Sequence, residues 1–99
     1  MQFRINKTIV DTNKAIEQWR ETQDSDGSNL VGRLTGSQWH FQTLYRFKSG
    51  RFFIKHSSCV SGESDSLEEV TPKEAALWLM HCGDELPEDL RPFEEELSA

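Results

Sequence analysis

The sequence predicts an α+β fold in which a small antiparallel β-sheet has a C-terminal helix packed on one face. Two patterns carry this prediction: residues 39–57 alternate as the strands of a hairpin do, and residues 72–82 repeat apolar side chains at helical spacing behind a helix-start signal. The length of 99 residues predicts a single domain, 1–99, with one modest core.

The hairpin signal begins with alternating side chains over 39–47, where most odd positions are aromatic and most even positions are polar. This is the period of a half-buried strand. Ser49 and Gly50 then suit a turn, and residues 52–54 are apolar again. The sequence therefore predicts an antiparallel hairpin with strands at 39–47 and 51–57.

The register of this hairpin depends on the length of its turn. A two-residue turn at Ser49 and Gly50 sets Phe47 opposite Phe52, whereas a three-residue turn shifts the pairing by one and mixes the faces. We expect the two-residue turn, because register is best defined where one face is buried. The expected core face consists of Trp39, Phe41, Tyr45, Phe47, Phe52 and Ile54. The expected outer face carries His40, Arg46, Phe53 and Lys55.

The helix signal starts at Thr71, which forms a capping box with Glu74 and precedes a proline at the first helical position. Gly83 suits the left-handed residue that ends a helix. The apolar stripe of this helix is Ala75, Trp78, Leu79, Cys82 and Leu86. We expect Trp78 and Leu79 to meet hairpin side chains, namely Tyr45, Phe47 or Ile54.

The remaining segments give weaker signals. β-branched residues around Asn6 and Lys7 suit a strand or a tight hairpin at 3–10, of which we expect a strand, and 15–21 fits a helix or a strand. Two polar stretches, 24–29 and 57–66, are typical of loops, and 67–70 fits a short strand ahead of the helix.

Charge is unevenly distributed along a chain of net charge −6. The segment 83–99 holds seven acidic residues against one basic residue, while 27–62 holds five basic residues and no acidic one. The acidic C-terminal tail, 84–99, is expected to be partly helical. Either the basic middle and the acidic end attract each other, or both are simply solvated.

The chain shows no apolar run of bilayer-spanning length, and its first residues lack the apolar stretch of a secretory signal. Its two cysteines, Cys59 and Cys82, are too few for a disulfide framework and suit free thiols in a reducing compartment. We therefore expect a cytoplasmic protein without a membrane partner.

Candidate catalytic and metal-ligating residues fall short of a recognisable site. His56 and Cys59, with His81 and Cys82, supply four zinc-type ligands, but the adjacent pair points about 100° apart on a helix. Cys59 near His56 lacks a third orienting group, and the glutamate runs suit solvated faces. The sequence thus predicts no catalytic residues, no metal site and no cofactor, and we expect a protein that is not an enzyme.

Two stretches carry a resemblance. Thr43-Leu44-Tyr45-Arg46, followed after three residues by Gly50-Arg51-Phe52-Phe53, and then Thr71-Pro72-Lys73-Glu74-Ala75 with Trp78, are similar to motifs of small uncharacterised bacterial proteins. The likeness covers most of the chain. It implies a hairpin followed by a helix, and no known activity. Because such proteins occur in plasmid, phage and defence-associated gene neighbourhoods, it implies a mobile-element or defence context for a protein whose role, by elimination, is accessory or regulatory.

By elimination, the sequence favours a protein that acts by binding another, unidentified protein, since its tryptophans are typical interface anchors. The alternative is nucleic-acid binding through the basic aromatic hairpin 39–57. The candidate binding surface for either function is Arg46, Lys48, Arg51, Phe53 and Lys55. The oligomeric state is not predicted.

Overall fold

The computed structural model describes residues 2–5, 7–26 and 29–98, which form antiparallel strands and two α-helices. The strands are β1 (Gln2–Ile5), β2 (Thr8–Asp11), β3 (Glu17–Arg20), β4 (Gln23–Asp26), β5 (Asn29–Gly32), β6 (His40–Arg46), β7 (Phe52–Ser58) and β8 (Ser66–Val70). The helices are η1 (Thr12–Lys14), α1 (Pro72–Cys82), η2 (Glu88–Leu90) and α2 (Pro92–Leu97). The mixed α+β class agrees with the sequence prediction.

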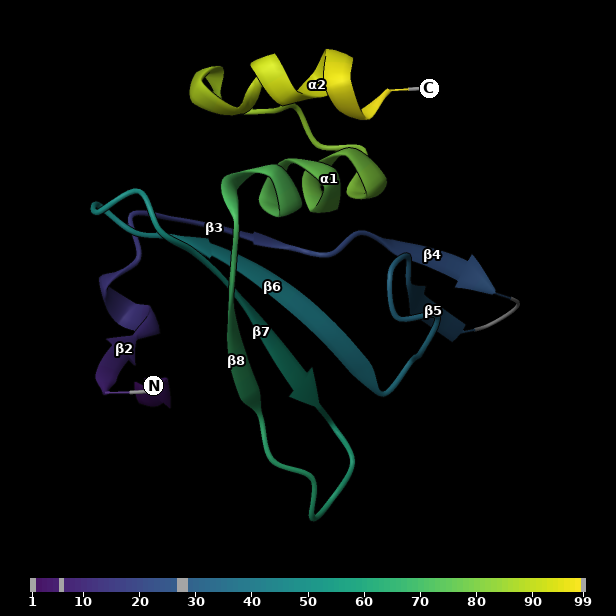
Figure 1. Ribbon diagram of the computed structural model, residues 1–99. Helices are drawn as coiled ribbons and strands as arrows, with labels where there is room; N and C mark the ends of the chain where they lie inside the picture. Colours follow the sequence, from purple (N-terminus) through teal and green to yellow (C-terminus); the bar gives the residue numbers. More distant parts are fainter. Residues whose placement is uncertain (1, 6, 27–28, 99) are drawn as a thin grey trace.

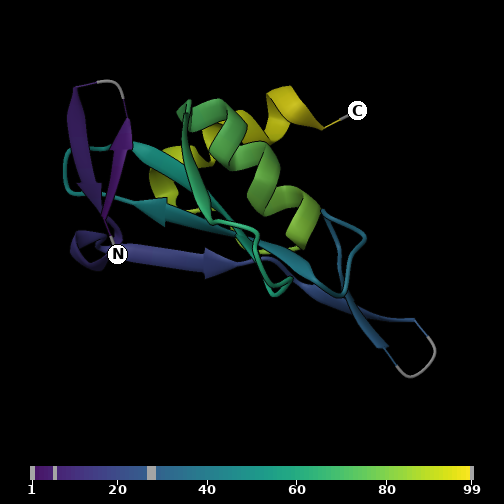
Figure 2. The same ribbon diagram turned by 90° about the horizontal axis from the view of Figure 1, so that it is seen from below.

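The central sheet has four strands in the order β3-β6-β7-β8, and two further hairpins, β1-β2 and β4-β5, stand at its ends. In Figure 1 the two helices lie above this sheet and the β1-β2 hairpin lies below it. Figure 2 shows β1-β2 beside the β6-β7 turn and β4-β5 at the far end of the molecule. The two faces of the sheet therefore meet different parts of the chain.

Helix α1 forms as the sequence predicts. The Thr71 hydroxyl accepts from the Glu74 N–H at 3.1 Å, and the Glu74 carboxylate accepts from the Thr71 N–H at 2.9 Å. Hydrogen bonds from the backbone N–H and the side chain of Thr71 lower the pKa of the Glu74 carboxyl. At the other end, Gly83 adopts a φ of 75°, the left-handed conformation that glycine tolerates without strain.

The β6-β7 hairpin forms, but the expected register is wrong. Arg46 pairs with Phe52 and Tyr45 pairs with Phe53, one residue away from the pairing that a two-residue turn would give. The Phe47 N–H donates to the Arg51 carbonyl, and Gly50 has a φ of 85° inside a three-residue turn. Glycine relieves the steric cost of that left-handed residue, so the longer turn is accessible.

This register separates the side chains that were expected to share one core face. Leu44, Phe52 and Ile54 lie on the face toward α1, in one buried cluster with Trp78 and Leu79. Tyr45 and Phe47 alternate with these residues and lie on the opposite face. The complete cluster is Leu44, Phe52, Ile54, Val70, Ala75, Ala76, Trp78, Leu79, Cys82, Leu86 and Leu90. Of the three expected neighbours of the helix, only Ile54 belongs to it.

The N-terminal third also departs from the expectations. The single strand expected at 3–10 is a hairpin, in which Phe3 pairs with Val10. Within 15–21, the residues Glu17–Arg20 form strand β3 and pair with β6. The polar stretch 24–29 lies largely in β4 and β5, while its residues 27 and 28 fall outside the described part of the chain.

A buried carboxylate fixes the segment between β5 and β6. Glu21 is 3% exposed, and its two oxygens accept from the backbone N–H groups of Leu34, Thr35 and Gln42 at 2.8 to 3.2 Å. A Cβ on Gly32 would come within 2.6 Å of this carboxylate. Only glycine therefore lets the backbone at position 32 lie this close to the Glu21 carboxylate, around which the loop folds.

Candidate binding pocket

The candidate surface predicted from the sequence does not form one continuous patch. Because alternate residues face opposite ways, the register places Arg46 on the α1 side and Phe53 and Lys55 on the other side. Phe53 is 2% exposed, so its ring is covered instead of lying open to solvent. The expectation that Arg46, Phe53 and Lys55 share an open face is therefore wrong.

Arg46 connects the basic middle of the chain to the acidic end. Its guanidinium donates to Asp89 at 2.5 Å and to Glu17 at 3.4 Å, and its side chain is only 19% exposed. The first of the two alternatives for the charge pattern, mutual attraction, thus holds at this contact. Arg46 secures the segment that contains η2 against the sheet.

Arg51 and Phe53 lie together at the start of β7. The Arg51 guanidinium donates two hydrogen bonds to the carboxylate of Glu69, at 2.8 and 2.9 Å. Its central carbon lies 5.1 Å from the centre of the Phe53 ring. The guanidinium lowers the pKa of Glu69, and the carboxylate raises that of Arg51. Phe47 meets the Phe53 ring edge-on, with centroids 5.3 Å apart. Lys48 is exposed in the adjacent turn.

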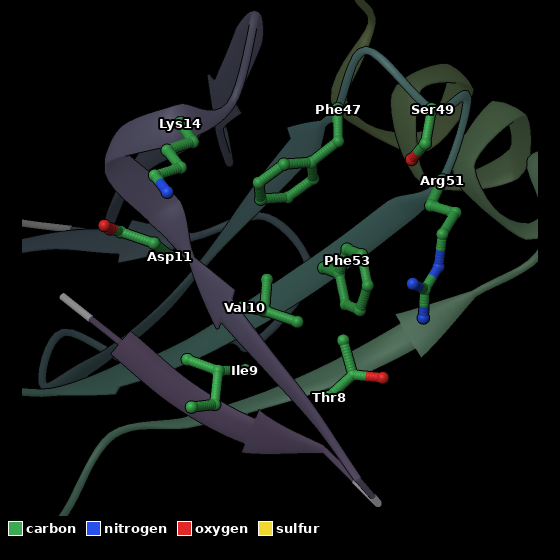
Figure 3. A pocket seen from close by; sticks show the side chains of 9 residues that line it. All are labelled: Thr8, Ile9, Val10, Asp11, Lys14, Phe47, Ser49, Arg51 and Phe53. Carbon is green, nitrogen blue, oxygen red and sulfur yellow. The ribbon is translucent and has the colours of Figure 1, made fainter.

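These two rings form the floor of a pocket between the β6-β7 turn and the β1-β2 hairpin (Figure 3). Val10, 5% exposed, joins them, and the exposed Ile9 stands at the margin. The other lining residues are Thr8, Asp11, Lys14, Ser49 and Arg51. The pocket has a volume of about 150 Å³.

The size and lining of this pocket suit one apolar side chain. Pockets that hold small-molecule ligands are usually larger, about 300–1,000 Å³. An apolar floor with charged groups at its rim is typical of a site that receives the anchor residue of a protein partner. Of its residues, sequence reasoning named Arg51 and Phe53 for a binding surface but missed Val10 and Lys14, because it favoured a single strand over a tight hairpin at 3–10.

A group of three side chains elsewhere looks like a catalytic triad but is not arranged as one. The Ser37 hydroxyl is 3.0 Å from Nδ1 of His40, whose Nε2 is 2.9 Å from the Glu63 carboxylate. The same Ser37 oxygen accepts from the N–H groups of Trp39 and His40. Since those bonds occupy its lone pairs, the hydroxyl is a turn cap and a poor nucleophile.

The cysteines and histidines that were considered as zinc ligands do not gather in one site. Cys82 is buried in the core and Cys59 is exposed, and burial raises the pKa of the Cys82 thiol. Nε2 of His56 lies 2.7 Å from a carboxylate oxygen of Glu68, so its ring pairs with β8. Across the described residues, no three His, Cys, Asp or Glu side chains gather closely enough to hold a metal ion.

No described helix is long and apolar enough to cross a membrane. In comparisons with protein-family models, with curated proteins and with solved structures, no match to this chain was found.

Proposed function

We propose that the chain is a non-catalytic accessory or regulatory protein of the cytoplasm that binds another protein. In this proposal one apolar side chain of the partner enters the pocket above Phe47 and Phe53. The mobile-element context implied by the sequence resemblance remains part of the proposal.

One observation carries the proposal: the half-buried Phe47, with Phe53 packed edge-on against it, lines an open pocket whose size matches a single side chain. The rim adds selectivity, because Lys14 has no ion pair with any described residue and its charge is available to a partner. The proposal also takes α1 to cover the opposite face of the sheet, and the buried cluster that joins α1 to Leu44 and Ile54 supports this.

The alternative, nucleic-acid binding through Arg46, Arg51 and Phe53 of the basic aromatic hairpin 39–57, has less support. Arg46 and Arg51 are engaged with carboxylates, and Phe53 is buried. Base stacking needs an accessible ring face, which Phe53 does not offer here.

The test compares two substitutions at exposed isoleucine and leucine positions. Ile9→Asp places a charge at the margin of the pocket, whereas Leu30→Asp makes the same change of charge on β5, at the other end of the molecule. The two side chains are 68% and 57% exposed, so neither change should unfold the protein.

Tagged wild type and both variants are used to capture partners from the native host, and the captured protein is then titrated by calorimetry. We expect wild type and Leu30→Asp to bind one common partner, and Ile9→Asp to weaken its affinity at least tenfold. A partner that binds Ile9→Asp as tightly as wild type would place its interface elsewhere. If the wild-type protein captures no specific partner, the proposal of protein binding is itself wrong.

A further inference from the structure

The aromatic row of β6 is only partly covered on the face away from α1. The β1-β2 hairpin lies over the end of this row near Phe47, where the pocket is. At the other end Trp39 directly precedes β6, its carbonyl accepts from the Cys59 N–H, and its side chain is 55% exposed. Phe41, two residues along, is half-buried. The exposed Trp39 and the half-buried Phe41 therefore lie outside the proposed pocket.

Two cations lie on the strands that flank β6. The Arg20 guanidinium of β3 lies 4.0 Å from the centre of the Phe41 ring, and the Lys55 ammonium of β7 lies 5.8 Å from that of Tyr45. Thr43 of β6 pairs with Arg20 on one side and with Lys55 on the other, so the two cations lie on either side of it. Among the described residues neither cation forms an ion pair.

The acidic groups near this face are already engaged. Glu69 of β8 is held by Arg51, and Asp65 accepts from the Ser58 N–H. The positive charge of Arg20 and Lys55 is therefore left for an anionic ligand, although the chain as a whole carries a net charge of −6.

We propose that this face, made by Trp39, Phe41, Arg20 and Lys55, binds single-stranded nucleic acid. The exposed Trp39 ring would stack on an unpaired base, while Lys55 and Arg20, which lies over the Phe41 ring, would contact the phosphates. A double helix hides the faces of its bases, so a single strand fits this surface better. The proposal does not depend on the pocket, which lies at the other end of the aromatic row. Because the whole chain is acidic, the binding will be weak and confined to this face.

The test measures the fluorescence anisotropy of a labelled oligothymidylate across a series of salt concentrations. With two phosphate contacts, the slope of log affinity against log salt should be about −1.4 for a single strand. Trp39→Ala should weaken binding roughly tenfold, as expected for the loss of one stacked base. Lys55→Glu and Arg20→Glu should each also weaken binding, because each replaces a proposed phosphate contact with a negative charge.

The matched control is Lys7→Glu, which makes the same change of charge at an exposed position between β1 and β2. It should bind as wild type does, and circular dichroism of every variant checks the fold. No anisotropy change at low salt overturns the proposal, as does an equal loss from Lys7→Glu and Lys55→Glu. If the oligonucleotide does not bind but Trp39→Ala abolishes capture of a protein, the face is a protein interface and the proposal is wrong.

Discussion

At the scale of single residues, Glu21 explains how a short polar segment keeps a defined path. A buried carboxylate is costly unless its oxygens receive hydrogen bonds, and this one receives three from backbone N–H groups. The hydroxyl of Thr35 adds a longer contact of 3.3 Å. Glu21 thus supplies the acceptor for the N–H groups of Leu34 and Thr35, while Arg33 and Gly36 donate to backbone carbonyls.

We predict that Glu21→Gln lowers the free energy of unfolding by about 2 kcal/mol, because an amide NH₂ would face backbone donors that have lost their acceptor. Chemical denaturation measures this change. Glu95→Gln, an exposed position in α2, is the matched control and should shift stability by less than about 0.5 kcal/mol. Equal stability of the two variants would show that the Glu21 contacts contribute nothing.

At the scale of elements, the helix was predictable and the hairpin register was not. The capping box, proline and Gly83 are local signals, and they mark the ends of α1 in the structure as in the sequence. Register depends instead on which face is buried, and here both are: Phe52, Phe53 and Ile54 are all buried in succession. Alternation in β6 alone could not decide between a two-residue and a three-residue turn.

The contact between helix and sheet gives the prediction at this scale. Trp78 is 6% exposed, and its indole N–H donates to the Gln42 side chain at 2.9 Å. Trp78→Ala should cost about 3–5 kcal/mol, because it leaves a large cavity and an unpaired amide oxygen.

Leu77→Ala is the control, since Leu77 is the neighbouring residue and 38% of its surface is exposed. Urea titrations of both variants give the comparison. If Trp78→Ala is no more destabilising than Leu77→Ala, α1 does not depend on this packing.

At the scale of the whole molecule, the sheet has a cluster shared with α1 on one side and a small hairpin on the other. The sequence indicated the α+β class and the central hairpin. It did not reveal that β1-β2 folds back under Phe47 and Phe53, because that contact joins residues far apart in the chain and Val10 is its only deeply buried apolar side chain from β2. For the same reason the candidate surface was only partly identified.

Both proposals depend on the register that sends Phe53 toward the β1-β2 hairpin and Phe52 toward α1. Nuclear Overhauser contacts between α-protons across β6 and β7 test it directly, since such protons are closest in pairs without mutual hydrogen bonds. The structure predicts strong contacts for Leu44 with Ile54 and for Arg46 with Phe52. A strong contact between Tyr45 and Ile54 instead would contradict this register, and with it the pocket and the open aromatic face.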